Sequence, residues 1–161
     1  MRARRTAGLL VAILAGYALW LSLEARSAAG DDAVGSVDVH EICVRVRDGR
    51  PPVFVDVREP EEFAEEHLPM AISMPVREMI ARAQSELPGA DLLVPYCLKD
   101  FRGFEGARRL LQLGFADVRV MKQVGINGWK AAGLPTAGAI PGRSDGETSH
   151  ELLEICQRQA S

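Results

Sequence analysis

Apolar and polar residues along this chain follow two alternating patterns, one typical of buried strands and one typical of amphipathic helices. Short, mainly apolar runs predict strands at 53–57, 91–96 and 117–121. Apolar residues three or four positions apart predict helices at 39–46, 76–87 and 103–115. Pro60 is placed to begin a further short helix, since proline is favoured in a first helical turn. The middle of the chain therefore alternates between strand and helix.

The N-terminal segment has a different pattern. Residues 7–23 form a stretch of 17 residues without a charge, preceded by three arginines among the first five residues. This length fits a membrane-spanning helix or the apolar part of a signal peptide. Small residues at 27–29 favour cleavage, whereas Tyr17 and Trp20 favour a retained helix with interfacial anchors. We expect residues 1–29 to be a basic segment followed by a transmembrane anchor or a signal peptide.

The basic N-terminus also predicts where the rest of the chain lies. Arginines that flank an apolar segment stay on the cytoplasmic side of the membrane. We therefore expect one N-terminal apolar helix in the cell (inner) membrane, with the following domain outside the cytoplasm. If the segment is cleaved, the domain is periplasmic or secreted instead.

The C-terminal segment is predicted to add little structure. Residues 136–148 are rich in Gly, Pro and Ser, which is typical of a linker. Residues 151–157 are apolar enough for a last helical turn or two, either docked on the domain or frayed. We therefore expect residues 138–161 to be a linker and a short tail.

Cys97 is the main candidate for chemistry. It ends the apolar run at 91–96 and precedes the helix predicted at 103–115. Unpaired backbone N–H groups and the positive end of the helix dipole favour a thiolate at such a position. A thiolate is the reactive, nucleophilic form of cysteine. A buried structural cysteine at the end of a strand is the alternative, and position alone does not decide between the two.

Four segments in order resemble the rhodanese family, at 53–75, 96–102, 107–118 and 125–135. The resemblance covers about residues 34–137. It implies an α/β domain in three layers, with a central parallel sheet flanked by helices. It also implies sulfurtransferase activity, in which a catalytic cysteine carries sulfur as a persulfide.

The resemblance carries over to individual residues. It implies that Cys97 is catalytic and that the loop which binds the substrate comprises Leu98, Lys99, Asp100, Phe101 and Arg102. In the related phosphatases this loop is one residue longer and holds a tetrahedral phosphate. The shorter loop here favours a single sulfane sulfur, and therefore sulfur transfer over phosphate ester hydrolysis. Arg102 could orient the oxyanions of a donor or tie the loop down.

Three residues depart from the family pattern. Asp100 stands where the family usually has Gly, Gly103 where it has Ser or Thr, and Val124 replaces the first glycine of a pair. A carboxylate at 100 opposes both a thiolate and an anionic donor such as thiosulfate, whereas Lys99 and Arg102 favour them. We therefore expect sulfur to come from a small sulfane-sulfur donor or a persulfide-carrying protein more readily than from thiosulfate.

Other polar residues near this loop have supporting or packing roles. Asp56 and Arg58 end the first core strand, and functional residues favour the C-terminal ends of parallel strands. A local ion pair that fixes the strand end is the alternative for these two. His67 is expected to pack or cap, and Trp129 to lie in the core.

Charge and composition limit the partners. Of the 161 residues, 47% are hydrophobic, which is material for one core. Residues 30–161 hold 15 basic and 21 acidic residues, which argues against nucleic acid as a partner. Residues 97–130 nevertheless hold seven basic and three acidic residues, so this part is locally basic. Membrane contact is expected only through residues 7–23.

The three cysteines and three histidines complete the inventory. Cys43 is expected in the core, and a Cys43–Cys156 disulfide would leave Cys97 free. A redox pair of Cys97 and Cys156 is the rival arrangement. No cysteine or histidine spacing resembles a metal site, and no cofactor-binding motif is present, so we expect neither. Two functions remain: a sulfurtransferase, or a non-catalytic or redox-sensing binding module on the same fold.

Overall fold

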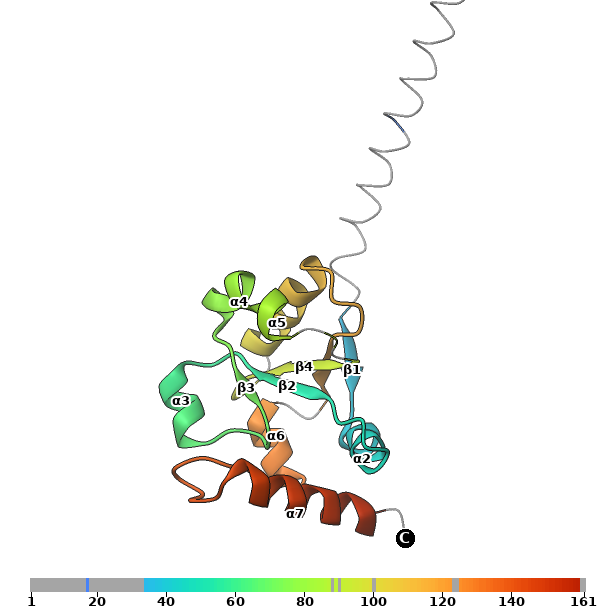
Figure 1. Cartoon of the computed structure of the whole chain (residues 1–161), viewed down its shortest axis with the longest axis vertical. Coiled ribbons are helices and arrows are strands. Elements are labelled where there is room, and N and C mark those ends of the chain that lie inside the picture. Colours follow the sequence, from blue (N-terminus) through green and yellow to red (C-terminus); the bar gives the residue numbers. More distant parts are fainter. Residues whose placement is uncertain are drawn as a thin grey trace, which may run out of the picture. The chain divides into compact units, whose positions relative to one another are not determined.

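The computed structural model describes residues 17, 34–87, 89, 91–99, 101–122 and 125–159. The unit from Val34 to Ser161 is compact and holds all the strands among these residues (Figure 1). The apolar helix expected at residues 7–23 lies outside the described residues, apart from Tyr17. Among the residues that are described, no helix has the length and apolar character needed to cross a bilayer.

The strands are parallel, as the resemblance implied. They are β1 (Gly35–Val37), β2 (Val53–Asp56), β3 (Ile72–Ser73), β4 (Leu93–Tyr96) and β5 (Arg119–Met121). β2 lies between β3 and β4, β1 pairs with β5, and a parallel bridge from Leu93 to Val118 joins β4 to the start of β5. Asp56 is opposite Tyr96 in the register, so β2 and β4 end side by side.

Helices cover both faces of this sheet. They are α2 (Val39–Arg47), α3 (Pro60–Glu65), the 3₁₀ helix η1 (Val76–Glu78), α4 (Met79–Glu86), α5 (Phe101–Gln112), α6 (Gly125–Ala131) and α7 (Asp145–Arg158). Figure 1 shows α4 and α5 on one side of the strands and α2, α6 and α7 on the other. The expected three-layer α/β arrangement is therefore confirmed.

Local sequence explains where several helices begin. The Asp38 carboxylate accepts a hydrogen bond of 2.9 Å from the Glu41 backbone N–H and so caps α2. Pro60 occupies the first turn of α3, as predicted. Ser144 and Glu147 form a reciprocal capping box at the start of α7. This capping box was not predicted from the sequence.

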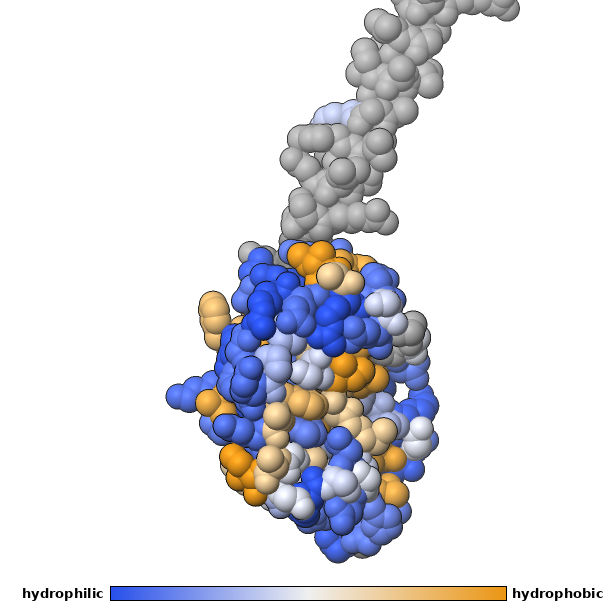
Figure 2. Space-filling view, turned by 60° about the vertical axis from the view of Figure 1, so that its left-hand side comes forward, coloured by the Kyte–Doolittle hydropathy of each residue, from blue (hydrophilic) through white to orange (hydrophobic). Residues whose placement is uncertain are grey.

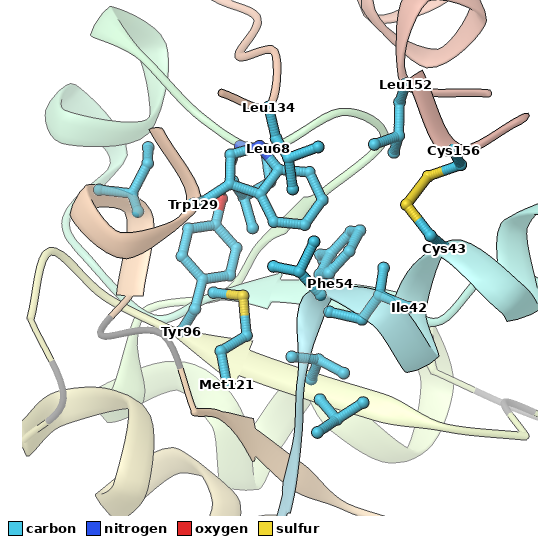
Figure 3. Close-up of a cluster of buried hydrophobic side chains, with 14 of the residues drawn as sticks. Ile42, Cys43, Phe54, Leu68, Tyr96, Met121, Trp129, Leu134, Leu152 and Cys156 are labelled. Atoms are coloured by element: carbon cyan, nitrogen blue, oxygen red, sulfur yellow. Dashed lines mark hydrogen bonds between the residues drawn. A yellow bond between two sulfur atoms is a disulfide. The ribbon is translucent and has the colours of Figure 1, made fainter. Parts of the chain in front are cut away.

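The pleat of β4 divides the core between the two faces. Leu92, Val94 and Tyr96 pack with residues of α2, α6 and α7, and these include Trp129, which is buried as predicted. Figure 3 shows this first core around Phe54, Tyr96 and Trp129. Residues Leu93 and Cys97 point to the opposite face, where they pack with α4 and α5. Because both faces are buried, the strands are apolar throughout rather than alternating.

Residues 138–161 are more ordered than the linker and short tail expected there, and the docked alternative for the tail agrees with the structure. Residue 145 begins the 14-residue helix α7 inside the segment expected to be linker. Ala137 pairs with His67 in an antiparallel bridge just before it. The Cys43–Cys156 disulfide attaches α7 to α2, as Figure 3 shows, and Cys97 is the free cysteine. The predicted alternative, a redox pair of Cys97 and Cys156, is therefore wrong, because Cys156 is buried and forms a disulfide with Cys43.

The outer surface of the folded unit is mainly polar. Figure 2 shows one face, on which apolar side chains form separate patches among polar ones. Large apolar side chains that are exposed among the described residues of this unit are Met70, Ile80, Leu98, Phe101, Phe104 and Ile140.

Candidate functional site

Cys97 follows β4 directly and lies at the edge of the sheet where β2 also ends. Its side chain is only 3% exposed and faces α5. The thiol donates a hydrogen bond to the Lys99 carbonyl oxygen, with 3.1 Å between sulfur and oxygen. The strand, the loop and the helix therefore hold the sulfur in one position.

The start of α6 packs directly on this loop. The Ile126 backbone N–H donates a hydrogen bond of 2.9 Å to the Cys97 carbonyl oxygen. Gly125 has a φ of +57°, and a Cβ there would overlap the Cys97 carbonyl oxygen and lie 2.9 Å from that of Leu98. Only glycine permits both this backbone conformation and this approach. The segment at 125–135 therefore has a physical role beside the cysteine.

The start of α5 is equally close to β4. A Cβ at Gly103 would lie 3.2 Å from the Tyr96 Cα and 3.3 Å from the Pro95 carbonyl oxygen. One turn later, a Cβ at Gly106 would lie 2.9 Å from a Val57 methyl group. Gly103 thus lets α5 pack against the backbone next to Cys97, and Gly106 lets the same helix pack against the Val57 side chain. Gly103 departs from the family pattern at a position where space is short.

A small cavity lies beside the thiol. It is lined by Pro95, Tyr96, Cys97, Lys99, Gly103, Val120, Met121 and Gly125. Its volume is about 10 Å³, which is room for about one water molecule. A single extra sulfur atom on Cys97 fits such a space, whereas a tetrahedral phosphate is larger.

Arg102 makes an ion pair with α3. Its two terminal nitrogens donate to both carboxylate oxygens of Glu62, at 2.9 and 3.1 Å. The hydrogen bonds from Arg102 lower the pKa of Glu62, and the same bonds raise the pKa of Arg102. Of the two roles expected for Arg102, this geometry corresponds to holding the loop and α5 in place.

Asp56 and Arg58 form a buried ion pair at the end of β2. The Arg58 Nη2 is 2.6 Å from Asp56 Oδ2, and it also donates to the Glu66 carbonyl oxygen. Burial is the largest single influence and would lower the pKa of Arg58, but the hydrogen bonds to Asp56 and the attraction of nearby negative charges together outweigh it, so the pKa is raised. The alternative of a local ion pair that fixes the strand end describes this geometry.

Tyr96 is a site neighbour that the sequence analysis did not single out. Its hydroxyl oxygen accepts a hydrogen bond of 3.0 Å from the Leu68 backbone N–H. Burial, and then the nearby Asp56 carboxylate, raise the pKa of Tyr96 well above its ordinary value. Tyr96 stays neutral and holds the backbone next to Cys97 in place.

The remaining predicted residues differ in where they lie. Leu98 and Phe101 point outward, and Lys99 forms no ion pair with the described residues. Asp100 lies outside the described residues, as does Val124. His67 stacks on Phe63, and its Nδ1 lies 2.8 Å from the Phe63 carbonyl oxygen, so it packs as expected.

Metal binding was not expected from the sequence. Within the part of the chain that the structure describes, no three histidine, cysteine or acidic side chains converge as ligands.

Comparisons with known proteins agree on one family. The family model described as a rhodanese-like domain matches residues 42–132. A sulfurtransferase from Allochromatium vinosum is 30% identical over 102 residues, which are 63% of this chain and 94% of that protein. An uncharacterized protein from Synechocystis is 36% identical over 86 residues, 52% of this chain and 46% of that one.

Solved structures resemble this fold. The rhodanese-like domain of an Anabaena protein superposes with a TM-score of 0.60 at 30% identity, covering 68% of this chain and 83% of that one. A thiosulfate sulfurtransferase from Pseudomonas aeruginosa has a TM-score of 0.60 at 24% identity, which shows a shared fold. It covers 65% of this chain and 20% of that one.

Proposed function

This chain belongs to the rhodanese-like domain family, and we propose that it is a sulfurtransferase in which Cys97 carries the transferred sulfur. The observation that carries the proposal is the cavity of about 10 Å³ beside the Cys97 thiol. A cavity of that size accepts one further sulfur atom and little else. The sulfurtransferase from Allochromatium vinosum, of which this chain covers 94%, supports the same type of reaction.

The proposed reaction has two steps. The Cys97 thiol first loses its proton, and the thiolate attacks the outer, sulfane sulfur of a donor. A bond forms between the two sulfurs, the bond from the sulfane sulfur to the donor breaks, and the donor leaves with the electron pair. In the second step a thiolate or other nucleophile attacks the outer sulfur of the Cys97 persulfide, and the Cys97 thiolate leaves. The two steps involve no net oxidation or reduction.

The backbone around the cavity suits this chemistry. The start of α5 approaches the loop closely because Gly103 has no side chain. Its first N–H groups have no partner within the helix, and such groups favour the negative charge of a thiolate or persulfide. Cys97 is held in this position by β4 and by α6, because its carbonyl oxygen accepts a hydrogen bond from the Ile126 N–H.

The test is the mass of the intact protein after incubation with thiosulfate, polysulfide or glutathione persulfide. The wild-type chain should gain one sulfur atom from at least one donor, and Cys97→Ser should gain none. The disulfide removes Cys43 and Cys156 as competing thiols. If Cys97→Ser gains sulfur as readily as the wild type, Cys97 is not the carrier.

A binding module is the second candidate, and the burial of the thiol favours it. Cys97 is only 3% exposed, and the cavity that it lines is small. If the wild type gains no sulfur from any of the three donors while its fold is intact, this candidate replaces the sulfurtransferase.

We also propose that the domain lies outside the cytoplasm, anchored by residues 7–23 or released after their cleavage. The Cys43–Cys156 disulfide supports this location, because structural disulfides persist in oxidising compartments and are rare in the cytosol. The arginines ahead of residue 7 support the same orientation.

A further inference from the structure

Apolar side chains are exposed directly beside the buried thiol. Phe101, the first residue of α5, is 85% exposed, and Leu98 and Phe104 are 40% and 39% exposed. Phe101 and Phe104 are three residues apart on a helix and therefore neighbour each other on its surface. Leu98 belongs to the loop that leads from Cys97 into this helix. These three side chains are called the aromatic face below.

The aromatic face continues into a groove along α5. The groove has a volume of about 460 Å³ and is lined by Phe101, Phe104, Glu105, Arg108, Arg109 and Gln112. Exposed aromatic side chains next to arginine are the composition that marks the centre of protein interfaces. An exposed phenylalanine contributes nothing to the core and is available for contact with a partner.

The charge around the aromatic face is positive. The described residues of α5 carry Arg102, Arg108 and Arg109 against the single acidic residue Glu105, and Arg102 and Arg109 are paired with Glu62 and Glu105. Lys99 adds a further cation that has no ion pair among the described residues. The chain as a whole has a net charge of −3. With Glu62 counted, four cations stand against two carboxylates among the described residues around the aromatic face, so this surface attracts acidic partners more than the chain as a whole does.

The cavity restricts how such a partner delivers or takes sulfur. It holds about one atom beside a thiol that is 3% exposed. A sulfur atom on a flat protein surface cannot enter it. A cysteine at the tip of a mobile segment can, provided that the surface around that cysteine rests on the exposed residues beside the entrance.

We propose that the aromatic face is the docking surface for an acidic protein that presents a cysteine thiol or persulfide on a mobile segment. This inference rests on the proposed sulfur transfer by Cys97. Three side chains and one groove make a small interface, which is typical of transient complexes. A transient complex suits a sulfur carrier, which has to leave after each transfer.

The first test measures docking without sulfur chemistry. The probes are two peptides of leucine with glutamate or of leucine with lysine, each with one serine in place of the reactive cysteine. Binding to the Cys97→Ser protein is followed by NMR chemical-shift changes. The glutamate peptide should bind at least five-fold more tightly than the lysine peptide. Phe101→Ser should weaken its binding at least five-fold.

The second test measures transfer to Cys97 in the wild-type chain, by intact mass. The donors are the glutamate peptide with a cysteine persulfide, and glutathione persulfide as a small donor. Phe104→Ser, which changes the aromatic face outside the loop that binds the substrate, should slow transfer from the peptide about ten-fold and leave transfer from glutathione persulfide within about two-fold. Ile80→Ser is the matched control, because Ile80 is 66% exposed on α4 and lies outside the aromatic face.

Three outcomes contradict the proposal. Equal binding of both peptides, or an equal effect of Phe104→Ser and Ile80→Ser on transfer, shows that the aromatic face is not a docking surface. Equal slowing with both donors shows that Phe104 acts on the site itself. Absence of sulfur on the wild type with every donor contradicts the proposed function as well, and this result is distinct from a change in docking.

Discussion

At the scale of single residues, the site depends on close backbone approaches rather than on many polar side chains. Gly125 lets α6 reach the Cys97 carbonyl oxygen, and Gly103 lets α5 reach the end of β4. The charged residues around them are paired with one another, Arg102 with Glu62 and Arg58 with Asp56. The thiol thus lies in a cradle of backbone, and the ion pairs hold the elements that form it.

Gly125→Ala should disrupt this cradle. An alanine at a φ of +57° costs about 1–2 kcal/mol, and its Cβ would also overlap the Cys97 carbonyl oxygen. We expect a lower melting temperature and slower sulfur loading of Cys97. Gly133→Ala is the control, because Gly133 has a φ of +73° but no atom within 4 Å of its Cβ position. Equal losses in both variants would show that contact with the loop is unimportant.

The pair of Glu62 and Arg102 predicts a pH dependence. Arg102 lowers the pKa of Glu62, so the folded state binds this proton less readily than the unfolded state. The resulting stability is present above the unfolded pKa, about 4.5, and disappears as the pH falls through the lower folded pKa. Glu62→Gln should therefore cost up to about 1 kcal/mol at pH 7, since the pair is partly exposed.

The measurement is urea unfolding of the wild type and of Glu62→Gln at pH 7 and near pH 3. The difference in the free energy of unfolding should shrink at the lower pH. A difference that stays the same at both pH values would mean that the Glu62 charge is not its origin. Glu86→Gln is the control. Glu86 pairs with Arg82 on α4, so this variant shows how much an ordinary surface ion pair contributes to the free energy of unfolding.

At the scale of elements, the sequence predicted those parts in which one local pattern decides the structure. The strands around residues 53 and 93 and the helices α2, α4 and α5 follow from apolar runs and helical spacing. The short strands β1 and β3 were missed, because two or three residues give no periodicity. Helix α6 was missed because glycines at 125 and 128 lower its helix propensity. Packing on the loop, which is not local, explains why it forms.

The candidate site, like the fold, was predicted only where local sequence decides the structure. The position of Cys97 after a strand and before a helix follows from the chain itself. The partner of Arg102 does not, because Glu62 is 40 residues away in sequence. Helix α7 was predicted only in its second half, because its first turn is polar and its preceding segment is rich in glycine and proline. Two long-range contacts fix it: Asp145 accepts from the Met70 N–H, and Cys156 bonds Cys43.

The disulfide predicts a large contribution to stability at this scale. It closes a loop of 113 residues, and a disulfide typically contributes about 2–4 kcal/mol to the free energy of unfolding, with long loops at or above the upper end of that range. The double variant Cys43→Ser with Cys156→Ser should lose about that amount in chemical denaturation. Adding a reductant should lower the stability of the wild type and leave that of the double variant unchanged. An equal effect of reductant on both would contradict the prediction.

At the scale of the whole molecule, the disulfide connects the fold to the proposed location. Both cysteines are buried between α2 and α7, and α7 lies beyond the part of the chain that matches the family. A chain in a reducing compartment would have three free thiols and a less firmly attached α7. The firm attachment of α7 therefore depends on the N-terminal segment, if that segment carries the domain into an oxidising compartment.

This dependence can be measured by counting thiols in a bacterial host. Cells expressing the full chain, or the chain without residues 2–29, are denatured in a maleimide reagent large enough to shift the protein on a gel. The full chain should react once, at Cys97, because the domain is exported and its disulfide forms. The shortened chain should stay in the cytoplasm and react three times. In both cases Cys97→Ser should remove one shift, which identifies the thiol. Three reactions for the full chain would show that the domain remains in a reducing compartment, and the proposed export would then be wrong.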